Sequence, residues 1–215
     1  MDFRRSSANY DLLYAKWLEN PGKLLDMVGW KPGMRLLDLC GGTGAIALEA
    51  LRRGAKEGDV VLLDVDPRCP DPRVLKIRGE AERLGEHLWY EKFDIVICRQ
   101  SVSFLDVSSS PGLAMFPAIH DLLNPGGRLV FNTFAKPRWL VKPYRYKGRW
   151  FLEVSAYIGR QVFHLQAGHG LGTDVTAFRW HDPQALAMQV SRAGFDTVDL
   201  IDGGKSVYVL ASKRP

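Results

Sequence analysis

The chain of 215 residues is long enough for one domain with a full hydrophobic core and short for two. Hydrophobic residues make up 46% and charged residues 25%, which excludes a disordered or collagen-like chain. The sequence contains neither an apolar run of the roughly 18 residues that span a bilayer nor the apolar core of a secretion signal. Three cysteines without CxxC spacing indicate neither a disulfide framework nor a metal site, so we expect a cytoplasmic protein without a metal ion.

The formal net charge of +5 originates in one segment. Six lysines and arginines and no acid lie between Ala135 and Phe151, and they alternate with aromatic residues in AKPRWLVKPYRYKGRWF. Such a segment can bind an anionic or aromatic small molecule, close over a pocket as a lid, or grip RNA. A solvated connector is the remaining alternative.

The first predicted elements are helices. Apolar residues recur with helical spacing from Tyr10 to Leu18, and Pro21-Gly22 interrupts the pattern. A short second helix is expected around Leu24 to Val28.

Strands and helices then alternate. The buried run MRLLDLC ends in a glycine-rich turn and passes into the helical AIALEALRRG. Further strands are predicted at 60–66, 74–79, 93–99 and 128–134, and a helix begins at Ser110-Pro111. Asp66-Pro67 is expected to cap another helix after the second strand. Strands separated by helices indicate a mainly parallel sheet that is covered on both faces.

The pattern changes after Phe134. Residues 135–181 contain alternating segments, WFLEVSAYI, QVFHLQAG and VTAFRWH, that predict an antiparallel meander. A helix from about Pro183 to Ala193 and two strands joined by Gly203-Gly204 end the chain. The predicted fold is α/β and doubly wound. It has a mainly parallel seven-stranded sheet, an antiparallel C-terminal hairpin and an antiparallel β insertion over the active site.

Two motifs indicate a nucleotide cofactor. The turn DLCGGTG, from Asp38 to Gly44, ends the first strand, where a doubly wound sheet binds its ligands. About 20 residues farther on, Asp64 ends the second strand, where a carboxylate can accept hydrogen bonds from both ribose hydroxyls. Residues 42–47 also satisfy GxGxxA, so a nicotinamide-dependent dehydrogenase is an alternative.

The order of the motifs resembles that of the class I S-adenosylmethionine-dependent methyltransferases over most of the chain. LLDLCGGTGAIALEA resembles that family's first motif, LLDVDP its second, GEAERL its acidic turn after strand three and LNPGGRLVF the segment before strand five. HDPQALAMQVSRAGF resembles its C-terminal helix. Cys40 replaces the first glycine of DxGxGxG, and Glu80 replaces the more usual aspartate. The resemblance implies S-adenosylmethionine as cofactor and S-adenosylhomocysteine as product.

The resemblance also implies cofactor contacts. In this family the second acid binds the ribose, and the acidic turn with its following amide reads the adenine. The segment SANYDLLYAKW resembles an N-terminal helix that covers the cofactor in small-molecule methyltransferases, which assigns residues 1–30 to a helical cover. The expected cofactor-binding residues are Tyr14, Asp38, Gly42, Gly44, Asp64, Val65, Glu80, Ala81 and Arg99.

Acceptor contacts are expected from two regions. Gln100 and Ser101 follow the fourth strand, and Tyr10 lies one helical turn before the cofactor-binding Tyr14. Arg145 and Arg149 belong to the basic segment, which we expect to be a mobile lid for an anionic or aromatic acceptor.

Two histidines of the insertion, His164 and His169, are candidate general bases because histidine titrates near neutrality. Structural roles are the alternative for both.

The sequence thus predicts one methyltransferase domain, residues 1–215, with residues 135–181 as a substrate cap. It would methylate a small molecule by in-line displacement. The alternatives are an RNA methyltransferase that uses residues 135–151 and a non-catalytic nucleotide-binding protein of the same fold.

Overall fold

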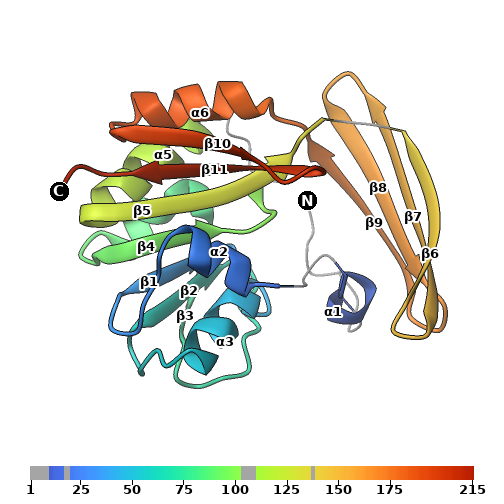
Figure 1. Cartoon of the computed structure of the whole chain (residues 1–215), viewed down its shortest axis with the longest axis horizontal. Helices are drawn as coiled ribbons and strands as arrows, with labels where there is room; N and C mark the ends of the chain where they lie inside the picture. The colour runs from blue at the N-terminus through green and yellow to red at the C-terminus, as the bar shows by residue number, and fades with distance from the viewer. Residues whose placement is uncertain (1–9, 17–19, 103–109, 137–138) are drawn as a thin grey trace. The chain divides into compact units, whose positions relative to one another are not determined.

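A computed structural model describes residues 10–16, 20–102, 110–136 and 139–215 of the chain (Figure 1). The chain divides into two compact units. The insertion unit comprises residues 1–20 and 136–180, and the α/β unit comprises residues 21–135 and 181–215. Along the described ranges, no helix combines the length and the apolar content needed to cross a membrane.

The α/β unit contains a seven-stranded sheet with the strand order β10-β11-β5-β4-β1-β2-β3. Neighbours from β3 to β5 are parallel, whereas β11 runs antiparallel to both β5 and β10. The predicted α/β sheet with an antiparallel C-terminal hairpin is therefore confirmed. Its strands are β1 (Leu36–Leu39), β2 (Val60–Asp64), β3 (Leu75–Arg78), β4 (Phe93–Cys98), β5 (Leu123–Phe134), β10 (Thr197–Asp202) and β11 (Ser206–Ser212).

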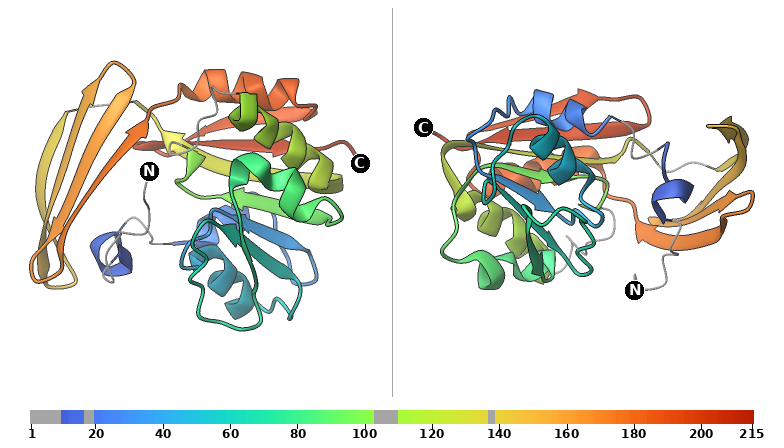
Figure 2. Two further views of the ribbon diagram at one scale, coloured as in Figure 1. Left: turned by 180° about the vertical axis from the view of Figure 1, so that it is seen from behind. Right: turned by 90° about the horizontal axis from the view of Figure 1, so that it is seen from below.

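Helices cover both faces of this sheet, as Figures 1 and 2 show. Helices α2 (Gly22–Met27) and α3 (Ala45–Arg52) pack on one face in a buried cluster with β-strand side chains. The other face carries α4 (Leu84–Leu88), α5 (Ser110–Leu122) and α6 (Pro183–Arg192) in a second buried cluster. Burial of the central strands on both sides explains why their sequences are continuously apolar rather than alternating.

The connection from β2 to β3 differs from the prediction. Residues 65–74 form no helix. The carboxylate of Asp66, predicted to cap one, instead pairs with Arg78 at 3.3 Å and Arg68 at 3.4 Å. The N–H of Arg68 donates to the carbonyl of Gly42 at 2.8 Å. The loop is therefore folded onto the glycine-rich turn, and these tertiary contacts replace helical ones.

The insertion unit contains a four-stranded antiparallel sheet in the order β6-β7-β8-β9, which confirms the predicted meander (Figure 1). Its strands are β6 (Leu140–Tyr146), β7 (Arg149–Ile158), β8 (Gln161–Gly168) and β9 (Gly172–Arg179). Helix α1 (Tyr10–Leu13) is shorter than the predicted helix, and a turn follows it. Residues 17–19, at the predicted end of that helix, lie outside the described residues.

Over its described residues 139–151, the basic segment forms a β-hairpin; its expected role as a mobile lid stays a prediction. Strand β6 pairs with β7 from Leu140 to Tyr146, and Lys147 and Gly148 make the turn. Their φ angles of 45° and 80° suit the two-residue turn that matches the twist of a β-hairpin. Alternation of tyrosines with basic residues in PYRYKGRWF therefore reflects strand periodicity.

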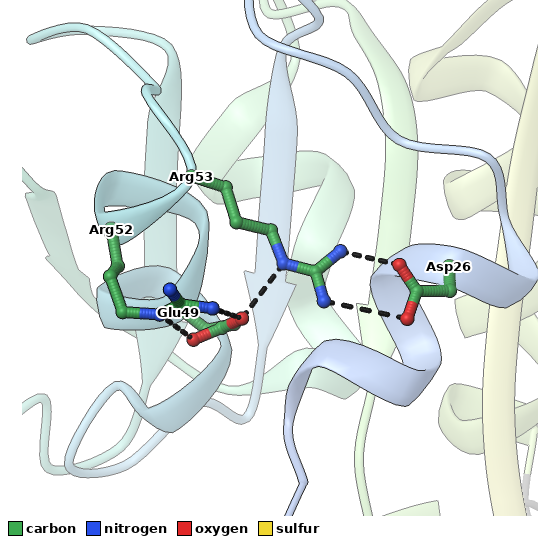
Figure 3. Close-up of polar contacts among 4 residues, drawn as sticks. All are labelled: Asp26, Glu49, Arg52 and Arg53. Carbon is green, nitrogen blue, oxygen red and sulfur yellow. Dashed lines mark hydrogen bonds and ion pairs between the residues drawn. The ribbon is translucent and has the colours of Figure 1, made fainter.

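Helices α2 and α3 are linked by a network of charged side chains, which Figure 3 shows in close-up. Arg53 donates to Glu49 at 2.7 Å and also pairs with Asp26 of α2. Arg52 donates to both carboxylate oxygens of Glu49, at 2.6 and 2.7 Å. Hydrogen bonds from Arg52 and Arg53 lower the pKa of Glu49 from 4.5 to about 2.

We expect Glu49→Gln to destabilise the protein by about 1 kcal/mol at pH 7, because two arginines lose a charged acceptor. Because the pKa of Glu49 is lowered in the folded state, the contribution of its carboxylate to the free energy of unfolding is complete above pH 4.5. This contribution is lost as the pH falls through 2. Urea unfolding at pH 7 and at pH 3 measures the difference. Glu57→Gln, at an exposed position, is the control. An equal loss at both pH values would contradict the assignment.

Candidate functional site

The turn after β1 adopts a backbone that favours glycine. Cys40, Gly42 and Gly44 have φ angles of 56°, 53° and 81°. Cys40 holds the position of the first glycine in DxGxGxG, and its left-handed conformation costs roughly 1 to 2 kcal/mol for a residue with a side chain. Cys40 therefore adopts the left-handed backbone of this turn although it is not a glycine.

The carboxylate of Asp64 connects the ends of β1 and β2. Its Oδ2 accepts the N–H of Gly42 at 3.0 Å, and its Oδ1 accepts the N–H of Asp66 at 2.8 Å. A carboxylate has about four acceptor positions, so these bonds leave capacity for hydroxyl donors. A Cβ at Gly42 would meet no atom nearer than Oδ2 of Asp64, at 4.0 Å. The turn thus borders open space beside a carboxylate, and Val65 next to it is 44% exposed.

Asp38 is directed into the protein. It is 1% exposed, and its Oδ2 accepts the N–H of Ala47 in the first turn of α3 at 3.1 Å. Burial raises the pKa of Asp38 to about 7, which outweighs the lowering by the Ala47 hydrogen bond and by nearby Arg99. This carboxylate anchors the helix that follows the turn, and its predicted contact with the cofactor stays a prediction.

The residues that follow β4 are fixed by polar contacts with neighbouring strands. Ser101 Oγ donates to the carbonyl of Arg99 at 2.9 Å and lies 3.4 Å from the carbonyl of Cys40. Gln100 has a φ of 57°, and its N–H donates to Oδ1 of Asn132 at 2.9 Å. Sequence reasoning missed Asn132, although a polar residue within the apolar strand RLVFNTF was a usable signal.

The turn after β3 carries the predicted adenine-reading residues. Glu80 is exposed, and its N–H donates to Nε2 of His87 at 3.3 Å. Ala81 is buried and begins a short 3-10 helix, η2 (Ala81–Arg83). The N–H of Gly79 donates to the carbonyl of Asp64 at 3.0 Å, so this turn adjoins the end of β2. The α/β unit thus holds the predicted cofactor residues other than Tyr14, at the carboxyl ends of β1 to β4.

In the insertion unit, Tyr14 and His164 lie near each other. The hydroxyl of Tyr14 donates to Oδ2 of Asp174 at 2.6 Å, and the Tyr14 and His164 ring centroids are 6.3 Å apart. Nδ1 of His164 lies 2.9 Å from Oγ of Ser155. Burial lowers the pKa of His164, which favours the neutral ring near pH 7.

The other predicted residues of this unit are placed elsewhere. His169 is exposed in the turn after β8, five residues or about 16 Å along the strand from His164. Arg145 is exposed and lies between Tyr144 and Tyr146 in β6, so its side chain projects from the other face of the sheet than theirs. In the strand pairing it lies opposite Trp150 of β7. Arg149 is exposed at the hairpin turn. Tyr10 begins α1, and its side chain lies outside the described residues. Among the side chains that are described, no cluster could hold a metal ion.

Comparisons with known proteins identify the family of the chain. The family model described as "Methyltransferase domain" matches residues 11–200, so the chain belongs to the methyltransferase domain family. It is a class I methyltransferase, the class whose methyl donor is S-adenosylmethionine.

The chain has relatives in sequence and in structure. The ubiquinone/menaquinone biosynthesis C-methyltransferase UbiE of Edwardsiella ictaluri is 27% identical over 194 residues, covering 84% of this chain and 74% of the relative. Among solved structures, DesVI of Streptomyces venezuelae has a TM-score of 0.68 with 24% identity, covering 96% of this chain and 97% of that one. CalS10 of Micromonospora echinaspora, an amino pentose methyltransferase, has a TM-score of 0.67 with 19% identity, covering 97% and 93%.

The buried Asp38 makes stability depend on pH in a direction opposite to that of Glu49. Its folded pKa of about 7 lies above the ordinary 3.8, so its contribution is complete below pH 3.8 and is lost as the pH rises through 7. Between pH 4 and pH 7.5, we expect the free energy of unfolding of wild type to fall by on the order of 2 to 4 kcal/mol relative to that of Asp38→Asn. Urea unfolding of both proteins across this range measures it. Parallel curves would refute the assignment.

Two glycines of the turn are expected to respond differently to a methyl group. At Gly44 a Cβ would lie 2.6 Å from Sγ of Cys69, so Gly44→Ala should cost about 3 kcal/mol of stability. At Gly42 the space is open, and Gly42→Ala should cost about 1 kcal/mol for its left-handed backbone alone. Chemical denaturation compares the two variants, and equal losses would be inconsistent with this difference in packing.

Proposed function

We propose that this protein transfers a methyl group from S-adenosylmethionine to a small molecule by in-line displacement. The observation that carries the proposal is the carboxylate of Asp64 beside the N–H of Gly42, at the carboxyl ends of β1 and β2. Ligands of doubly wound sheets bind at this edge, where a glycine-rich turn lets them approach the backbone. The sulfonium group of the bound cofactor supplies an electrophilic methyl group.

The residues present suit this cofactor. Asp64 has lone pairs for the two ribose hydroxyls, and the exposed apolar Val65 offers a surface for the adenine. Glu80 and the backbone of Ala81 are assigned to the adenine edge. Gly42, Gly44, Arg99 and Tyr14 are assigned to the methionine portion, and Gln100 and Ser101 to the acceptor.

A small-molecule acceptor is favoured over RNA. The printed names of UbiE and CalS10 describe a C-methyltransferase of quinone biosynthesis and an amino pentose methyltransferase. A groove for RNA requires cations and aromatic rings gathered along one surface. In the hairpin, Arg145 lies on the opposite face from Lys142, and Lys147 occupies the turn. Within residues 139–151, the cations of the basic segment are therefore divided between the two faces of the sheet and the turn.

Catalysis would consist mainly of alignment, because displacement at the sulfonium carbon needs little covalent help from the protein. His164 is the candidate base, since burial favours its neutral form and a neutral imidazole can accept a proton from the acceptor. Its contact with Ser155 holds one ring nitrogen in place. We do not assign a catalytic role to the exposed His169.

The proposal is tested by Asp64→Ala. We expect the dissociation constant for S-adenosylmethionine, measured by calorimetry, to rise roughly 10-fold to 100-fold, because the ribose loses a charged acceptor worth about 1.5 to 3 kcal/mol. Asp71→Ala removes an acid of the same loop that is paired with Arg73, and it should leave binding unchanged. Equal affinities in wild type and a folded Asp64→Ala variant would refute the assignment. Tight binding of NAD without S-adenosylmethionine would refute the function.

A further inference from the structure

One face of the insertion sheet is apolar and open to solvent. The register pairs Val141 with Val154 and Val154 with Leu165. Leu165 pairs in turn with Val175, so one apolar row crosses all four strands (Figure 1). Residues two apart along each strand project to the same side of the sheet. We call this side the apolar face, and its large side chains that are between 37% and 74% exposed are Val141, Trp150, Leu152, Ile158, Phe163 and Val175.

Helix α1 packs on the other face of this sheet. Leu13 of α1 lies in a buried cluster with Phe151, and its carbonyl accepts a hydrogen bond from Nε2 of Gln166 at 3.2 Å. The two acids of the four strands, Glu153 and Asp174, project to the same side as Gln166. An antiparallel sheet that is covered on one face ordinarily has polar side chains on its solvated face. Here the solvated face is the more apolar one, so contact with solvent alone does not account for its sequence.

The few polar residues of the apolar face lie near the ends of the strands. They are Arg145, Gln161, Thr173 and Arg179. Along the four described strands, this face contains no acid. Its two cations lie on different edge strands, Arg145 on β6 and Arg179 on β9, so the centre of the face is uncharged. An apolar centre with a polar rim is the anatomy of a protein–protein interface.

The size of the apolar face approaches what a stable interface needs. The exposed surface of its six large side chains amounts to roughly 600 Å². Half-buried apolar residues between them, such as Val154 and Leu165, extend it toward the about 800 Å² that each partner of a stable protein complex buries. Monomeric proteins rarely expose a contiguous apolar patch larger than a few hundred Å². A second apolar surface is therefore the partner that suits this face.

We propose that the apolar face is the interface of a homodimer, in which it packs on the same face of a second copy of this chain. A twofold axis brings one patch against its own copy, so the patch must be complementary to itself. The apolar face meets this condition, because its centre is uncharged and its cations lie at the rim. Two sheets packed face to face lie about 10 Å apart with interdigitating side chains, a geometry that suits a continuous four-stranded face.

Face-to-face packing is favoured over pairing of two sheets edge to edge. Pro143 lies on the edge strand β6 and lacks the N–H that a further strand would need there. Edge pairing would also leave the rings of Trp150 and Phe163 in solvent, whereas face-to-face packing removes both from water. The inference concerns the association of two chains, and it does not depend on the proposed methyl transfer.

Sedimentation velocity of the full chain tests this inference. We expect wild type to sediment with twice the mass of one chain at micromolar concentrations. Phe163→Glu should raise the dissociation constant of the dimer roughly 100-fold or more, because the new carboxylate would be buried in the apolar interface without a counterion. Val175→Glu, on the edge strand β9, should weaken the dimer for the same reason. Tyr90→Glu is the matched control, since it places the same charge at an exposed aromatic residue of the α/β unit, and it should leave the dimer unchanged.

Far-UV circular dichroism of each variant shows whether the sheets are intact, and Val175→Glu decides if Phe163→Glu does not fold. A monomeric wild type at every concentration would overturn the inference, and so would a dimer that both variants leave unchanged. An equal loss of the dimer in Tyr90→Glu would place the interface elsewhere and overturn it as well. A monomeric wild type that floats with phosphatidylglycerol vesicles, while Phe163→Glu does not, would assign the apolar face to a membrane surface instead.

Discussion

The candidate site depends on one hydrogen bond, from the N–H of Gly42 to the carboxylate of Asp64. It joins the ends of two neighbouring parallel strands and holds a turn whose backbone is left-handed at Cys40, Gly42 and Gly44. The same carboxylate accepts the N–H of Asp66, and the carbonyl of Gly42 accepts the N–H of Arg68. One side chain thereby orders the turn that approaches a ligand and supplies the charge that would bind it.

Both units contain buried polar atoms with a hydrogen-bond partner and buried polar atoms without one. In the α/β unit, buried Asp38 and Asn132 each accept a backbone N–H, so their polar atoms support the fold. Thr133 Oγ1 and Gln189 Oε1 of the same unit, and Gln166 Oε1 of the insertion unit, are buried without a hydrogen-bond partner among the described residues. A buried polar atom without a partner lowers stability.

The basic segment shows how strand periodicity separates charges that lie close in sequence. Its charge and aromatic content predict a mobile lid for an anionic or aromatic acceptor, which stays a prediction, and strand periodicity distributes Lys142 and Arg145 to opposite faces. Strand pairing also sets Lys142 opposite Glu153, an acid that lies outside the segment. Residue counts along a segment therefore say little about the charge of the surface that the segment helps to form.

The sequence by itself determined the α/β sheet, its C-terminal hairpin and the methyltransferase class, because buried strands, glycine turns and the acids that follow them leave local patterns. It also singled out Gly42 and Asp64 from their positions at strand ends, and the structure joins the two by a hydrogen bond. Only the tertiary structure replaced the helix expected after Asp66 with a loop folded onto the turn. Only it assembled Glu153, Gln166 and Asp174 into one row, since cross-strand register depends on pairing between distant segments, which no local pattern encodes.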